Sequence, residues 1–129
     1  MSGIVWLLQE PPKDKARFDI AGAEAFGRIV SVLVAGEQPG FRPAEAYDRI
    51  AKKLESFDPE EDFLLYAGGD PLTLLITGAV LATRDDIETV KFLRFHRDRA
   101  SDGRLSEDGR YVEVRVPVYV GVNDDGDTT

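Results

Sequence analysis

A pair of glycines followed by an aspartate, Gly68-Gly69-Asp70, is the feature of the sequence that most suggests chemistry. It separates a strand-like apolar run from a longer apolar run of helical length. A strand that turns through glycines into a helix directs backbone N–H groups and the positive end of the helix dipole toward an anion. The three spaced glycines of dinucleotide-binding proteins and the phosphate-loop lysine are both missing. The turn therefore predicts either a phosphate site without a known fingerprint or a plain strand-to-helix turn capped by Asp70.

A second chemical feature is a basic group, Arg94, His96 and Arg97, in a chain that is otherwise acidic. Arg94 and His96 are two residues apart, so on a strand they share one face, where they could bind a phosphate or a carboxylate. His96 is the only histidine, which excludes a two-histidine metal site and a histidine relay. The alternative is a strand end kept soluble by charge, with ion pairs to Asp98 or Glu113.

Composition narrows the chemistry further. The absence of cysteine excludes disulfides, thiolate catalysis and cysteine-ligated zinc. A formal net charge of -8 argues against general nucleic-acid binding, which needs a basic surface. His96 has no obvious serine nucleophile nearby in the sequence. We therefore expect no metal and no cofactor, and the missing nucleophile–base pair favours a protein that is not an enzyme.

Hydropathy predicts a cytoplasmic protein that does not associate with membranes. The longest apolar run, 71–82, is too short to span a bilayer and suits a buried helix. Residues 1–8 are too short for the apolar core of a signal peptide and lack basic flanks.

The elements that must position these residues follow from apolar periodicity. Residues 1–120 are expected to form one domain, followed by an acidic, disordered tail, 121–129. Strands are predicted at 4–8, 28–34, 62–67, 89–95 and 111–120. Helical segments are predicted at 19–26 with Asp19 as cap, from Pro43 to Glu55, and over 71–82 with Asp70 as N-cap.

The two longer helices differ in pattern. The first has an apolar face, with charged residues on the other side; the apolar residues are Ala44, Tyr47, Ile50, Ala51 and Leu54. The second is apolar on nearly all sides, which predicts deep burial, and Gly78 in its middle predicts close approach to a neighbouring element.

The order of elements predicts an α/β fold with a mixed, mainly parallel sheet, Rossmann-like layering and a C-terminal antiparallel hairpin. We expect 28–34, 62–67 and 90–95 to be its central strands, and the position of the first strand stays open. In such a sheet, ligands bind outside the carboxyl ends of the strands. Segments 35–40, 68–70 and 94–99 should meet there.

Residues Tyr111 to Val120 alternate valine with larger or polar residues, which predicts a half-exposed strand. Pro117 places this strand at an edge of the sheet, because proline has no backbone N–H to donate to a neighbouring strand. An open edge predicts either a homodimer or binding of a protein partner by strand addition.

Part of the chain resembles known families. The stretch 62–71, its apolar helix, 90–97 and 109–112 are similar to small uncharacterised bacteriophage proteins, and this resemblance covers roughly the second half of the chain. It implies a viral accessory protein in a host bacterial cytoplasm and assigns no catalytic residue. Gly68-Gly69-Asp70 is also similar to the Gly-Gly-Asp motif of the NAD kinase and phosphofructokinase families, which place a glycine where this chain has Pro71.

Two functions from different classes follow. The first is a non-enzymatic interaction or regulatory protein, for example a phage accessory factor acting on a host or viral protein. The second is a small nucleotide- or phosphate-binding protein, for example a nucleotide hydrolase. Its site would be formed by Gly68, Gly69, Asp70, Arg94, His96 and Arg97 at the carboxyl ends of the strands.

Overall fold

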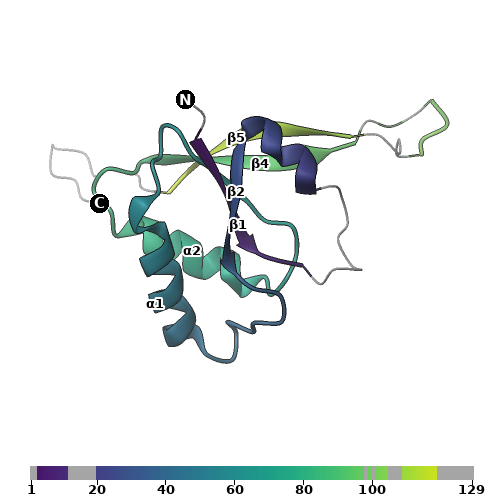
Figure 1. Ribbon diagram of the computed structural model, residues 1–129. Coiled ribbons are helices and arrows are strands. Elements are labelled where there is room, and N and C mark those ends of the chain that lie inside the picture. Colours follow the sequence, from purple (N-terminus) through teal and green to yellow (C-terminus); the bar gives the residue numbers. More distant parts are fainter. Residues whose placement is uncertain (1–2, 12–19, 98, 100, 105–108, 119–129) are drawn as a thin grey trace, which may run out of the picture.

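The computed structural model describes residues 3–11, 20–97, 99, 101–104 and 109–118 (Figure 1). Its strands are β1 (Gly3–Gln9), β2 (Gly27–Leu33), β3 (Phe63–Leu65), β4 (Thr89–His96) and β5 (Arg110–Pro117). Its α-helices are α1 (Pro43–Lys53) and α2 (Leu72–Ala82), and two short 3-10 helices are η1 (Ile20–Phe26) and η2 (Leu54–Ser56). The predicted cap Asp19, the pairing residue Asp98 and the tail 121–129 lie outside the described residues.

The five strands form one mixed sheet in the order β2-β1-β3-β4-β5. The pairs β1–β2, β1–β3 and β3–β4 are parallel, and β4–β5 is antiparallel. This confirms the predicted α/β fold with a mainly parallel sheet and a C-terminal antiparallel pair. The first strand, whose position was open, lies in the interior between β2 and β3.

One predicted central strand is wrong: 28–34 corresponds to β2, which is an edge of the sheet. The run is apolar and β-branched, which correctly predicts a strand but not its place in the sheet. In the structure, Val30 and Val32 contribute to the core on one face of the sheet, and Ile29 to the core on the other. A strand can be covered on both faces and still have only one neighbouring strand. The apolar pattern therefore shows that the faces of β2 are buried, but not whether β2 lies at an edge of the sheet.

The sheet separates two hydrophobic cores. The larger core joins α1 and α2 to one face of the sheet, where Trp6 and Leu8 meet Ile50 and Leu81. The smaller core lies on the opposite face, where Ala23 of η1 covers Val5 and Leu7. The two α-helices therefore share one face, and η1 packs on the other (Figure 1).

Helix α1 follows its amphipathic pattern. Pro43 begins it, as predicted, because the first turn does not use the missing N–H. Ile50 is fully buried, and Tyr47 is half-buried. The inner face is rotated slightly from the prediction, since Ala46 is buried and Ala44 is exposed.

Helix α2 contradicts the prediction of deep burial. Its buried residues are Thr73, Thr77, Val80 and Leu81. Leu72 and Leu75 are exposed at 44% and 69%, respectively. An apolar run without charged residues carries no periodic signal, so the sequence could not tell which side of the helix faces the sheet.

The prediction that Gly78 permits close approach within the chain is also wrong. A Cβ atom built on Gly78 would meet no atom within 4 Å. The glycine therefore faces open space beside the exposed Ala79 and Ala82.

Candidate functional site

The carboxyl ends of β1, β2 and β3 meet at one rim of the sheet, where the buried side chain of Gln9 joins three segments. Its Oε1 accepts hydrogen bonds from the Asp70 backbone N–H at 3.0 Å and from Thr73 Oγ1 at 3.1 Å. Its Nε2 donates to the carbonyl oxygens of Glu37 at 2.7 Å and Val34 at 3.4 Å. The amide thus uses both donor hydrogens and both acceptor positions. It connects β1, the loop after β2 and the start of α2.

The backbone conformation accounts for both glycines of the turn, and Gln9 accounts for the second one. Gly68 and Gly69 have φ angles of 129° and 102°, in the left-handed region that favours glycine. A Cβ atom on Gly69 would lie 2.4 Å from Gln9 Oε1. The close approach that the sequence suggested for an anion is therefore made by an amide of the protein itself.

The predicted N-cap is displaced by one residue, because α2 begins at Leu72 and its N-cap is Pro71 and not Asp70. Asp70 still bonds to the first turn of the helix. Its Oδ1 accepts from the Leu72 N–H at 3.0 Å, and its Oδ2 accepts from the Gly40 N–H at 2.8 Å. Two of the backbone donors that a phosphate would need, those of Asp70 and Leu72, are thus engaged by Gln9 and Asp70.

The basic residues lie at the far end of β4. Arg94 and His96 are exposed, and they share one face of the strand opposite Val112 and Arg110 of β5. Arg97 is half-buried, and its guanidinium lies 5.6 Å from the centre of the Phe95 ring.

The two predicted halves of the site extend in different directions from β3. The glycine turn bonds to Gln9 and Gly40, on the β1 side of β3. Arg94 and His96 belong to β4 and pair with β5, on the other side of β3. In the contacts described above, the glycine turn joins β1, the loop after β2 and α2. The basic residues lie at the exposed end of β4.

The edge strand β5 presents a second kind of surface. The valines that share one face of this strand are only partly covered, since Val114 and Val116 are 39% and 37% exposed. On the opposite face, Arg115 Nε donates to Glu113 Oε2 at 2.9 Å. Charged side chains therefore occupy one face of β5 and valines the other.

Exposed apolar side chains also gather near the start of α2. Phe41 is 81% exposed, and Leu75 is 69% exposed. A groove of about 430 Å³ runs between α1 and α2; its lining residues are Pro43, Ala44, Tyr47, Asp48, Leu75, Ile76 and Ala79. Large apolar side chains on a surface are typical of contact areas for other molecules.

Sequence reasoning missed two buried polar residues that organise the sheet. Gln9 carried a usable signal, since it is the one polar residue directly after the apolar run 4–8. Asp62 was predicted only as the first residue of a strand. In the structure it is buried, and its carboxylate accepts from the Ile4 N–H at 2.9 Å, Trp6 Nε1 at 3.0 Å and the Asp58 N–H at 2.9 Å.

The described residues exclude two classes of site within that part of the chain, a three-residue metal-binding cluster and a membrane-spanning helix. No three histidine, aspartate or glutamate side chains in this part of the chain come together as a metal-binding group. None of the helices in the same residues is long and apolar enough to cross a membrane.

Comparison with known proteins gives one match. The family model described as phage Pam3 gp32-like protein matches residues 4–117. These residues include both α-helices and all five strands except Gly3, the first residue of β1. No curated protein and no solved structure matches the chain.

Proposed function

The chain belongs to the phage Pam3 gp32-like protein family, and from this premise we propose that it is a non-enzymatic interaction protein. Its role would be that of a phage accessory factor that binds a host or viral protein in the bacterial cytoplasm. The observation that carries this proposal is the open edge of β5 with its half-exposed valines. Strand addition uses the free backbone groups of such an edge for affinity and the alternate side chains for specificity.

The side chains of β5 support binding along this edge. Natural edge strands are protected by charges, prolines or bulges. Pro117 and the Glu113–Arg115 pair protect one end and one face of β5. Val114 and Val116 leave the other face apolar and partly exposed. The simplest occupant is β5 of a second copy, which would extend the sheet across a two-fold axis.

Light scattering coupled to size-exclusion chromatography tests the proposal. We expect the wild-type protein to form a dimer, and the double substitution Val114→Lys with Val116→Lys to yield a monomer with an unchanged circular dichroism spectrum. The control is Leu75→Lys, which places the same kind of charge at a more exposed apolar position on α2 and should remain dimeric. A wild-type monomer at high concentration would remove the dimer; if affinity capture from infected and uninfected host lysates then also yielded no partner, the interaction role would be contradicted.

The nucleotide-binding alternative has weaker support, because Gln9 and Asp70 engage the donors of the glycine turn. Arg94 is its best remaining feature, as an exposed cation beside His96 on one face. A thermal-shift screen against nucleotides and phosphate esters decides between the two functions. A ligand at 100 times its Kd stabilises the folded state by about 2.7 kcal/mol. A shift of several degrees that Arg94→Ala abolishes would favour the nucleotide-binding function.

A further inference from the structure

We propose that the groove between α1 and β2 binds a flexible alkyl chain that ends in a carboxylate. This site is separate from the β5 edge and from the glycine turn, and it does not depend on the interaction role proposed above. The groove measures about 680 Å³. That volume lies within the range of small-molecule sites in proteins, which are mostly apolar with a few polar groups that fix orientation.

The floor of the groove is a continuous apolar strip. Val30 and Val32 are alternate residues of β2, and Val34 directly follows the end of this strand; all three line the same groove. Trp6 of the neighbouring strand β1 lies beside them and is held in place by its hydrogen bond to Asp62. Val34 is 56% exposed, which leaves the end of the strip open to a ligand. An apolar strip of this kind favours a linear hydrocarbon over a polar molecule.

The wall of the groove is cationic. Arg49, Lys52 and Lys53 of α1 line it, and the remaining charged lining residue is Glu37. Glu37 is already paired with Arg49. Lys52 and Lys53 are exposed, and neither has a carboxylate of the described residues at ion-pair distance. Two uncompensated ammonium groups in a protein of net charge -8 make this groove complementary to an anion.

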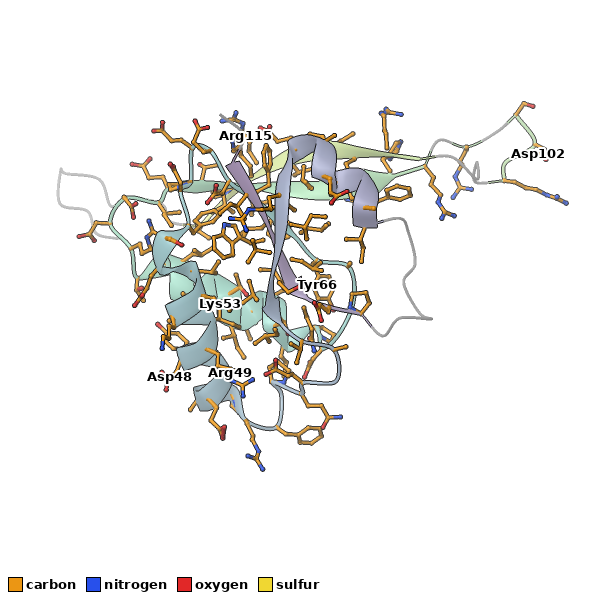
Figure 2. All side chains as sticks on the ribbon, viewed as in Figure 1. Asp48, Arg49, Lys53, Tyr66, Asp102 and Arg115 are labelled. Atoms are coloured by element: carbon orange, nitrogen blue, oxygen red, sulfur yellow. The ribbon has the colours of Figure 1, made fainter. Side chains whose placement is uncertain are left out.

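The two features are arranged along one line. Helix α1 follows β2 through a loop and runs back along it, with Arg49 and Lys53 on a different side of the helix from Asp48 (Figures 1 and 2). Because Arg49 pairs with Glu37 just after Val34, the two lysines lie toward the Val30 end of the strip. A carboxylate at the lysine end would place its hydrocarbon chain over the valines.

The length of the strip sets the length of the ligand. Three alternate strand residues span about 13 Å, at roughly 3.3 Å for each residue. An extended alkyl chain advances about 1.3 Å for each bond, because its C–C bonds of about 1.5 Å zigzag, so roughly eleven carbons cover that distance. Dodecanoate is therefore a suitable probe. The groove between α1 and α2 offers the internal comparison, because its charged lining residue is the anionic Asp48 and not a cation.

Trp6, the single tryptophan of the chain, reports binding directly. Dodecanoate, titrated below its micelle concentration, should change the tryptophan fluorescence in a saturable manner. The double substitution Lys52→Gln with Lys53→Gln should weaken binding at least tenfold, since both side chains are exposed and the fold does not depend on them. Dodecanol, which lacks the charge, should bind at least tenfold more weakly than dodecanoate. Leu75→Glu, in the other groove, should leave the titration unchanged.

Each of these arms can overturn the proposal. Equal binding of dodecanol and dodecanoate would show a nonspecific apolar surface. An unchanged affinity in the double lysine variant would remove the assigned role of the cations. Loss of binding in Leu75→Glu, with retention in Val34→Glu, would place the ligand between α1 and α2 instead. No saturable change of Trp6 fluorescence up to the micelle concentration would remove the site.

Discussion

Helices α1 and α2 have eleven residues each and cover the same face of the sheet, yet α1 buries only apolar side chains, whereas α2 buries two threonines together with Val80 and Leu81. In α1, the fully buried Ile50 faces the core and charged residues face the solvent. In α2, Thr73 and Thr77 are buried, whereas Leu72 and Leu75 are exposed. The comparison shows that the polarity of a residue predicts its burial only where the helix also carries polar residues that select an outer face. Without them, individual hydrogen bonds, such as that of Thr73 to the distant Gln9, contribute to the orientation of the helix.

The largest expected effect is a loss of stability, and it should differ between a buried apolar residue of α1 and an exposed apolar residue of α2. Ile50→Ala removes a fully buried side chain and leaves a cavity, so it should lower the free energy of unfolding by about 2–5 kcal/mol. Leu75→Ala, at an exposed position, should change it by only about 0.5 kcal/mol. Urea denaturation followed by circular dichroism measures both values. Similar losses for both variants would mean that α2 is buried in solution, for example in an assembly.

The second prediction separates the two buried threonines of α2. Thr73→Val removes a hydrogen bond to Gln9 Oε1 and should destabilise the protein by about 1 kcal/mol. Thr77→Val replaces a buried hydroxyl that has no hydrogen-bond partner in the described structure, so it should stabilise the protein by about 1 kcal/mol. The pair is internally controlled, because the same substitution is made twice on one helix face. Effects of the same sign would contradict the assigned hydrogen bonding.

The smallest effect concerns Gly78. Alanine has a higher helix propensity, and a Cβ atom at this position meets open space, so Gly78→Ala should stabilise the protein by about 0.8 kcal/mol. The melting temperature and the denaturation midpoint should both rise. A decrease would indicate that another molecule approaches α2 closely at Gly78, which would sharpen the contrast with α1.

The elements of the fold could be predicted from the sequence where the periodic signal was strong. The spacing of Ile50 and its apolar neighbours located α1, and the alternating valines together with Pro117 located β5 at an edge. The lateral order of the strands was not predictable for β2, since the pattern reports covered faces and not neighbours. The orientation of α2 was not predictable because its sequence lacks charges.

The residues of the candidate site were predictable as types but not as contacts. Gly69 allows a close approach, as the sequence suggested, and Asp70 bonds to the first turn of α2, although the N-cap is Pro71. The group that approaches Gly69 is the side chain of Gln9, which is about sixty residues away in the chain. Local sequence patterns cannot predict a contact between residues so far apart in the sequence. The groove between α1 and β2 was missed for the same reason, because its floor and its wall come from separate segments.

The interior position of β1 has a consequence for how the chain acquires its structure during synthesis. This strand is made first, but its two neighbours, β2 and β3, arrive at different times. When only β2 has emerged from the ribosome, one side of β1 still lacks hydrogen-bond partners, and the carboxylate of Asp62 that receives the Ile4 and Trp6 donors has not yet been made. Such non-local pairing slows folding, because the chain loses the entropy of closing the intervening loop before the contacts between the strands can stabilise the structure. The nascent protein therefore passes through an interval in which its most apolar strand is exposed to chaperones and to other unfinished chains.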